Sequence, residues 1–202
     1  MRIVLDNLGK KFAKDWIFKD ISREIISGQP LAITGPNGSG KSTLIMLISG
    51  FTLPSKGTIK YQLNGKNIEA SEIYKYVDLV APYTELIEEL TLMEFLKFHF
   101  SIKELIPDLD IPGLIDDIRL WKDKDKYIRH FSSGMKQRLK LALGLFSTSP
   151  ILLLDEPTTN LDVQNQDWFY NKVNTLFENK TLVIGSNKSE EYTFVEEFIN
   201  FE

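Results

Sequence analysis

The stretch from Gly35 to Thr43 constrains this chain more than any other, because each residue type in it has a task at a phosphate group. It reads Gly35, Pro36, Asn37, Gly38, Ser39, Gly40, Lys41, Ser42 and Thr43, which fits the pattern G-x-x-x-x-G-K-[ST]. The glycines allow backbone conformations that a Cβ would block, so consecutive N–H groups can surround phosphate oxygens. Lys41 supplies a compact positive charge, and the Ser42 hydroxyl is suited to bind Mg²⁺. The stretch predicts a loop that binds the phosphates of a nucleotide.

The residues on either side of this loop support the same interpretation. Residues 31–34 are a short apolar run, which predicts a strand, and residues 44–48 predict a buried helix. A helix that starts directly after the loop directs its N-terminus at the anion. The alternative is a glycine-rich turn that fits the pattern by chance, and the strand before it and the helix after it disfavour that alternative.

Composition indicates an ordinary globular protein and argues against several kinds of partner and site. The 202 residues include 43% hydrophobic and 26% charged residues, enough for one domain with an inserted lobe. The net charge is −4 and no long basic stripe occurs, so nucleic acid is not an expected partner. The absence of cysteine excludes disulfides and thiolate metal sites. No stretch approaches the ~20 apolar residues of a membrane span, so we expect membrane contact only through another chain.

The spacing of apolar residues changes along the chain and predicts a core with an insertion. Residues 3–5 and 17–21 predict two strands around a turn at residues 7–11, and residues 58–63 predict a strand that Asn64-Gly65 turns into a hairpin. From about residue 85 the apolar spacing becomes helical. We therefore expect one domain over residues 1–202, with an α/β core at 1–84 and 149–202 and a helical lobe at about 85–148.

A second informative stretch covers residues 131–138. Ser132 or Ser133 is suited to cap a helix, and the apolar spacing that follows is amphipathic. A capped helix is therefore one interpretation. The other is a second anion site, because serine hydroxyls, the small Gly134 and a helix N-terminus together favour phosphate.

The third stretch brings carboxylates to the end of a strand. Residues 151–154 are an apolar run typical of a parallel strand buried on both faces, and Asp155 and Glu156 follow it. At the edge of the sheet beside the phosphate loop, Asp155 is suited to hold Mg²⁺ directly or through water. Glu156 is suited to orient or deprotonate an attacking water. Adjacent acids are otherwise common in turns, but the phosphate loop upstream favours the functional interpretation.

These stretches, followed by residues 158–162, resemble the nucleotide-binding subunit of an ATP-binding cassette (ABC) transporter over nearly the whole chain. The resemblance implies an α/β P-loop NTPase fold with a RecA-like parallel sheet, an antiparallel β edge and an inserted helical subdomain. It implies binding and hydrolysis of ATP with Mg²⁺. It also implies two partners, a transmembrane permease subunit and a second ABC ATPase subunit in a homo- or heterodimer.

The resemblance also assigns roles to residues, position by position. Lys41, Ser42 and Asp155 match phosphate and Mg²⁺ ligands, and Glu156 matches the catalytic carboxylate. Ser132 and Gly134, with Ser133 between them, match the signature that contacts the γ-phosphate held by the partner. Asp162 matches a residue in the loop that communicates across the dimer. Phe12 matches the aromatic residue that stacks on adenine in the family. The alternative for Phe12 is an ordinary core position.

Three departures from the family pattern are expected to affect catalysis. The signature reads Phe131 to Met135, FSSGM, in place of the usual LSGGQ. Tyr83 stands where the family has a lid glutamine, and Asn187 stands where it has a switch histidine. Asparagine can hydrogen-bond a phosphate oxygen but cannot exchange a proton. Since Glu156 remains, we expect hydrolysis with a low basal rate.

The expected function is that of an energising subunit, cytoplasmic and peripheral at the inner face of the cell membrane. The surface that contacts the permease is expected between Tyr83 and Phe100, where aromatic residues appear among acids. Two alternatives remain open at this point. One is a soluble ABC-type ATPase that acts in assembly or repair, and the other is a nucleotide-binding switch with weak turnover.

Overall fold

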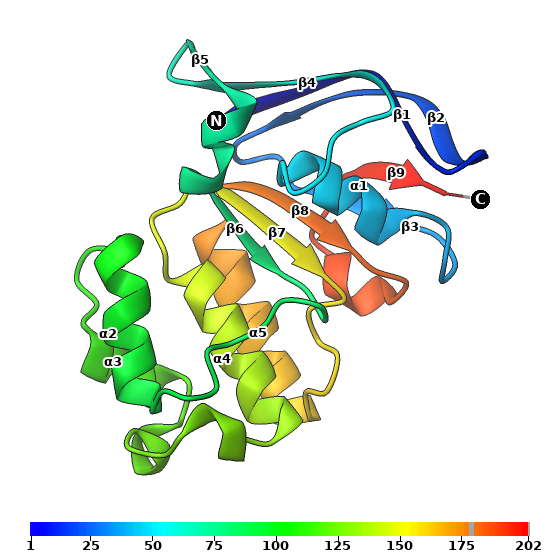
Figure 1. The fold of residues 1–202 in the computed structure, drawn as a ribbon. Helices are drawn as coiled ribbons and strands as arrows, with labels where there is room; N and C mark the ends of the chain where they lie inside the picture. The colour runs from blue at the N-terminus through cyan, green and yellow to red at the C-terminus, as the bar shows by residue number, and fades with distance from the viewer. Residues whose placement is uncertain (178–179, 202) are drawn as a thin grey trace.

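A computed structural model describes residues 1–177 and 180–201 of the chain. Residues 178, 179 and 202, which belong to the predicted core segment 149–202, lie outside the described residues. Two sheets and a set of helices make up the fold, and their arrangement confirms the predicted α/β class with a parallel sheet and a separate antiparallel β layer (Figure 1).

The two sheets differ in strand direction. The antiparallel sheet has the order β2-β1-β4-β5 and contains β1 (Arg2–Phe12), β2 (Asp15–Ile26), β4 (Lys56–Leu63) and β5 (Lys66–Ile68). The parallel sheet has the order β6-β7-β8-β3-β9 and contains β3 (Leu31–Thr34), β6 (Val77–Val80), β7 (Ile151–Asp155), β8 (Thr181–Gly185) and β9 (Glu197–Asn200). Strand β7 lies between two parallel neighbours, as its apolar run predicts.

The helices cover both faces of the parallel sheet. They are α1 (Lys41–Ile48), α2 (Leu92–Ile102), α3 (Ile111–Asp117), α4 (Ser133–Leu145) and α5 (Val163–Leu176). Helix α1 lies between the two sheets, while α4 and α5 pack below the parallel sheet and α2 and α3 lie beside α4 (Figure 1). Among the described residues, no helix combines the length and the apolar character that crossing a bilayer requires.

Strand β7 separates two apolar cores because successive side chains of a strand point to opposite faces. Ile151 and Leu153 belong to the core that contains α1 and the antiparallel sheet. Leu152 and Leu154 belong to the core under α2, α4 and α5. All five residues of β7 are buried, which fixes the strand in the middle of the molecule and with it the residues that follow at its carboxyl end.

The predicted turn at residues 7–11 is wrong. These residues continue β1, and the chain reverses only at residues 13–14. The pairing of β1 shifts register between Leu5 and Leu8 on one side and between Asp6 and Gly9 on the other, and Asn7 has a φ of 47°. This is a bulge, which uses the same residue types as a turn without ending the strand. The Asn64-Gly65 hairpin between β4 and β5 is confirmed.

The helical segment between β6 and β7 contains α2, α3 and α4, and its division from the core near residues 85 and 148 stays a prediction. Its aromatic residues do not all reach the surface, as the expected contact surface would require. Phe95 is 5% exposed and belongs to the core, whereas Phe98 is 48% exposed. His99 is partly buried, with the Phe100 ring edge-on at 4.9 Å between ring centroids.

Lys180, at the entrance to β8, is a buried cation that holds the end of α4. Its Nζ donates to the carbonyl oxygens of Gly144, Ser147 and Ser149, the last at 2.9 Å. The residue is 6% exposed, and burial lowers the pKa of its ammonium to about 8, although Asp78 acts in the opposite direction. Among the described residues no carboxylate forms an ion pair with Lys180, and burial without such a pair disfavours the charged form.

This pKa predicts that stability rises with pH between about 8 and 10.5. In that pH range Lys180 keeps its proton in the unfolded state but loses it in the folded state. The free energy of unfolding therefore rises with pH. From pH 7.5 to 9.5 the free energy of unfolding should rise by about 2 kcal/mol more for the protein than for Lys180→Met. Urea unfolding of both chains at the two pH values measures the difference, in which the titration of other groups cancels. Equal pH slopes for the two chains would contradict it.

Candidate active site

The carboxyl ends of β3, β7 and β8 meet at one edge of the parallel sheet. Gly185 pairs with Asp155 on one side and with Ile33 on the other. One residue further along, the N–H of Glu156 donates to the Gly185 carbonyl at 2.8 Å, and the N–H of Ser186 donates to the Ile33 carbonyl at 3.1 Å. The register therefore brings the start of the phosphate loop, the paired acids and the Ser186-Asn187 segment side by side, the place where open parallel sheets bind ligands.

The predicted phosphate loop connects β3 to α1, as expected, and its backbone requires glycine. Gly40 has a φ of 112°, and a Cβ there would lie 2.7 Å from Cγ2 of Ile17. Gly35 has a φ of 140° and faces the backbone of Phe201, where a Cβ would lie 2.4 Å from the carbonyl oxygen. Side chains other than glycine rarely adopt such angles. A pocket of about 280 Å³ opens over the loop, lined by Ile17, Asn37, Gly38, Gly40, Lys41, Ser42, Thr43 and Glu156.

Lys41 lies at the first position of α1 and is 6% exposed. Its Nζ donates to the carbonyl oxygens of Gly35 at 2.8 Å and Pro36 at 3.1 Å. The ammonium is thus held inside the loop by weak acceptors that a phosphate can replace. Ser39, in the same loop, has a buried Oγ without a hydrogen-bond partner among the described residues.

Asp155 ends β7 with a carboxylate that the described residues leave unsatisfied. The residue is 1% exposed, and neither carboxylate oxygen has a hydrogen bond of good geometry. Burial raises the pKa of the carboxyl, and the nearby hydroxyls of Ser42 and Tyr83 offset only part of this effect. A buried acceptor without a partner is costly, and a bound cation is one explanation for it.

Glu156 lines the pocket in an unusual backbone conformation. Its φ is 47°, which is uncommon for a residue with a Cβ and is found disproportionately at functional sites. Burial and then the charge of Glu191 raise the pKa of its carboxyl, while Lys41 lowers it. A carboxylate with a raised pKa next to a phosphate loop is suited to accept a proton.

Asn187 and Tyr83 reach the site from two other segments. The Asn187 Nδ2 donates to Oδ1 of Asn37 at 3.2 Å, so this residue contacts the phosphate loop. Tyr83 follows β6 and is 44% exposed. Burial and then Asp155 raise the pKa of its phenol, which places the hydroxyl next to that carboxylate. The roles that the family pattern assigns to Tyr83 and Asn187 stay predictions.

The signature residues lie outside this pocket and next to the loop that follows Glu156. The serine cap expected at Ser132 or Ser133 is at Ser132, the N-cap of α4, which accepts from the N–H of Met135 at 3.2 Å. A Cβ on Gly134 would lie 3.0 Å from the carbonyl oxygen of Asn160. Asp162 caps α5 by accepting from the N–H of Asn165 at 2.9 Å. Ser133 begins α4, and none of these residues lines the phosphate pocket.

Phe12 is 53% exposed at the end of β1 and is not among the residues that line the pocket. Ile17 of β2 lies there instead, against Gly40. No feature of the sequence distinguishes Ile17 from the other apolar residues of β2, because only the approach of β2 to the loop makes it different. The stacking role of Phe12 stays a prediction.

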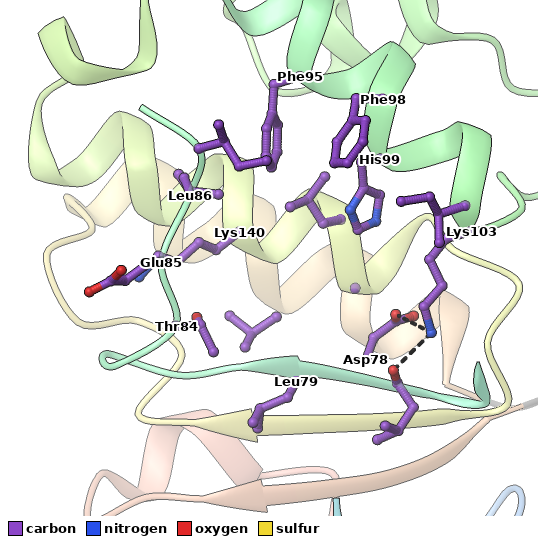
Figure 2. Close-up of a pocket in the computed structure, with 16 residues that line it drawn as sticks. Asp78, Leu79, Thr84, Glu85, Leu86, Phe95, Phe98, His99, Lys103 and Lys140 are labelled. Atoms are coloured by element: carbon purple, nitrogen blue, oxygen red, sulfur yellow. Dashed lines mark hydrogen bonds and ion pairs between the residues drawn. The ribbon is translucent and has the colours of Figure 1, made fainter. Parts of the chain in front are cut away.

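A second hollow, the β6–α2 groove, opens on the side of the molecule that carries α2. It has a volume of about 380 Å³ between β6, the segment after Tyr83, α2 and α4. Figure 2 shows Phe95, Phe98 and His99 of α2 above it and Asp78 and Leu79 of β6 below it. Lys103 closes one end through an ion pair with Asp78 at 3.4 Å. Three apolar residues around the groove are partly exposed, Ile87 at 41%, Phe98 at 48% and Ile102 at 69%.

Comparisons with known proteins agree with this geometry. The sequence model of the ABC transporter family matches residues 18–159. The Nod factor export ATP-binding protein I of Ralstonia nicotianae is 30% identical over 193 residues, which cover 93% of this chain and 60% of that protein. The sulfate/thiosulfate import ATP-binding protein CysA of Mesostigma viride is 29% identical over 208 residues, which cover 100% of this chain and 59% of that protein.

A solved structure of the ATP binding subunit of an ABC transporter has a TM-score of 0.87 with this chain. The alignment covers 100% of this chain and 86% of that one at 23% identity, a likeness that concerns the fold. This chain spans about three fifths of the length of the two curated relatives.

Proposed function

Because the chain belongs to the ABC transporter family through its ATP-binding domain, we propose that it binds and hydrolyses ATP with Mg²⁺ and thereby energises a membrane-spanning permease subunit. One observation carries the proposal, namely the meeting of three segments at the carboxyl edge of the parallel sheet. The phosphate loop, the acids Asp155 and Glu156, and Asn187 face one another there, although they are far apart in the sequence.

ATP is proposed to enter with its phosphates in the loop Gly35–Thr43. The backbone N–H groups and the N-terminus of α1 face the anion, and Lys41 turns from the carbonyls of Gly35 and Pro36 to the phosphates. The adenine lies toward the ends of β1 and β2, where Phe12 is the proposed stacking partner and Ile17 forms the wall.

Asp155 and Ser42 are the residues proposed to hold Mg²⁺. The unsatisfied oxygens of Asp155 fit a hard cation, and the Ser42 hydroxyl lies next to them. Among the described residues, no three His, Asp or Glu side chains gather as a metal cage. This suits Mg²⁺, which is usually held by one or two protein ligands together with phosphates and water. When bound, the ion would neutralise negative charge on the β- and γ-phosphates.

Glu156 is proposed to act as the general base. Its carboxylate accepts a proton from water as the water oxygen forms a bond to the γ-phosphorus. The bond from this phosphorus to the β–γ bridging oxygen breaks, its electron pair stays on ADP, and inorganic phosphate leaves. Asn187 hydrogen-bonds a γ-phosphate oxygen but cannot exchange a proton, so we propose a low basal rate.

A second ABC ATPase subunit, identical or different, is proposed to complete the site. Ser132, Ser133 and Gly134 do not reach the phosphate loop of their own chain, and a serine-capped helix N-terminus suits a phosphate presented by another subunit. The loop ending at Asp162 packs against this signature, and we propose that it communicates between the two subunits of the dimer. The helical residues 85–148 form the proposed signalling subdomain.

The permease is proposed to bind in the β6–α2 groove with a helix that carries apolar anchors. Tyr83 lies near Asp155, and the residues directly after it, Thr84 and Glu85, line the groove, so one short segment runs from the proposed nucleotide site to the groove. Phe98 and Ile102 are one helical turn apart and present apolar surface on one face of α2. We propose that the chain works in the cytoplasm, at the inner face of the membrane, because it would contact the membrane only through this permease.

Recovery of a multi-span partner tests this function. Tagged protein pulled down from gently solubilised native membranes should retain a multi-span protein in stoichiometric amount, identified by mass spectrometry. Phe98→Glu and Ile102→Glu should each reduce its recovery at least about tenfold, because a buried unpaired charge costs several times the ~1.4 kcal/mol that a tenfold loss requires.

Leu53→Glu is the matched control, because Leu53 is 74% exposed and is not among the residues that line the groove. It should retain the partner. Recovery of the chain only from the soluble fraction, without a multi-span companion, would overturn the transport function in favour of a soluble ATPase. Full recovery with both groove variants would move the docking surface elsewhere.

A further inference from the structure

Glu191 is a buried acid that belongs neither to the phosphate loop nor to the strand ends that form the candidate site. It lies in a 3₁₀ helix, η4 (Ser189–Tyr192), and is 0% exposed. Its Oε1 accepts two hydrogen bonds from Thr158, one from the backbone N–H at 3.1 Å and one from Oγ1. Its Oε2 is buried without a hydrogen-bond partner among the described residues.

This arrangement is poorly explained by stability alone. The nearest cation is Lys188, whose Nζ lies 3.9 Å from Oε1 and whose side chain is 45% exposed. An ion pair of this length and exposure contributes little, whereas a buried acceptor without a partner costs free energy. A neutral side chain would fill the site at lower cost. The presence of a glutamate here is therefore better explained by its hydrogen bonds to Thr158 than by its contribution to stability.

Glu191 connects two loops that both face the proposed γ-phosphate position. It follows Asn187 by four residues, and its partner Thr158 follows Glu156 by two. Thr158 is itself 1% exposed, so its contact with Glu191 is shielded from water. Glu191 thus connects the segment that carries the proposed base to the segment that carries the proposed γ-phosphate contact, and Lys188 adds a partly exposed bond from its Nζ to Oγ1 of Thr158 at 3.2 Å.

The tied segment needs such support, because its backbone is strained at Glu156. A positive φ in a residue with a Cβ persists only where the surroundings hold it. Three other contacts hold the segment. The Glu156 N–H donates to the Gly185 carbonyl, the side chain of Gln137 donates to the Pro157 carbonyl at 2.7 Å, and Nζ of Lys188 donates to Oγ1 of Thr158 at 3.2 Å. Glu191 adds two more bonds on the side of η4, and its side chain is fully buried, whereas that of Lys188 is 45% exposed.

We propose that Glu191 is a positioning residue that holds the loop from Glu156 to Thr158 in the geometry required for attack by water. It also keeps this loop at a fixed position relative to Asn187. This inference rests on the proposed ATP hydrolysis. It concerns the step of hydrolysis and not the binding of ATP, because Glu191 does not line the phosphate pocket.

The test compares Glu191→Ala and Glu191→Gln with the unaltered chain, each in the dimer with the permease that the pull-down identifies. Glu191→Ala should lower kcat about 10- to 100-fold with KM for ATP unchanged, because small misplacement of a reacting group costs this much. Glu191→Gln keeps an oxygen that accepts both bonds from Thr158 and should restore kcat to within a few-fold. Glu190→Ala, at the exposed neighbouring position, should match the unaltered chain.

Amide hydrogen exchange provides a second readout that does not depend on turnover. The Thr158 amide should exchange faster in Glu191→Ala than in Glu191→Gln or Glu190→Ala. If the unaltered chain hydrolyses ATP and Glu191→Ala has an equal kcat, the inference is overturned while the proposed function stands. An effect confined to KM, or no rescue by Glu191→Gln, would overturn it as well. If the unaltered chain does not hydrolyse ATP, the proposed function fails and this inference fails with it.

Discussion

Replacing Glu156 by glutamine should lower ATP hydrolysis by a factor of about 10² to 10⁴, the usual contribution of a positioned general base. The glutamine keeps the size of the side chain and can still hydrogen-bond the water, but its amide does not accept the proton. ATP binding should stay within a few-fold, because the phosphates are held by the loop and Lys41. Phosphate release from Mg-ATP by the dimer with its permease, together with a binding titration, measures both effects.

Glu69→Gln is the control for Glu156→Gln, since it removes a carboxylate of the same type at an exposed position on the antiparallel side of the molecule. It should leave both kcat and ATP affinity unchanged. A Glu156→Gln variant that hydrolyses ATP at the original rate would show that another group takes the proton. In that case the positive φ of Glu156 would have a structural cause only.

Replacing Lys41 by alanine should weaken ATP binding about 10- to 100-fold. A charge-assisted hydrogen bond contributes ~1.5–3 kcal/mol, and each ~1.4 kcal/mol is a factor of ten in affinity. Lys41 is buried, so the interaction with phosphate is poorly screened by water. The increase in melting temperature that Mg-ATP produces in the unaltered protein should be largely lost, because that increase follows from ligand binding to the folded state.

Two comparisons separate binding from folding in the Lys41→Ala variant. Its melting temperature without nucleotide shows what the bonds to Gly35 and Pro36 contribute to the empty loop. Lys60→Ala removes an exposed lysine from β4 and should keep the full response to Mg-ATP. An unchanged affinity for ATP in Lys41→Ala would contradict the proposed place of the phosphates.

The elements that a short stretch can define were predicted from the sequence. The strand, loop and helix around Gly35–Thr43, the N-cap at Ser132 and the Asn64-Gly65 hairpin all depend on backbone preferences of neighbouring residues. Strand β7 was predicted because a run of large apolar residues between polar ones has few other places in a globular fold.

The turn expected at residues 7–11 failed because its outcome depends on strands outside these residues. Asn7 does adopt a positive φ, as a turn residue would. The two neighbouring strands, β2 and β4, absorb the extra residue as a bulge, so that β1 continues to Phe12. Whether such a residue reverses the chain depends on whether partner strands are present on both sides, which only the assembled sheet shows.

The sequence by itself determined the family, the fold class and the candidate groups of the site, because the phosphate loop and the paired acids are short stretches whose residue types and spacing can be read directly. The tertiary structure alone decided which distant residues surround them. Ile17 at the loop and Glu191 against Thr158 come from segments in which the sequence marks neither residue. Burial and contact result from packing between strands far apart in the chain, and a carboxylate such as that of Glu191 acquires its role only when water is excluded around it.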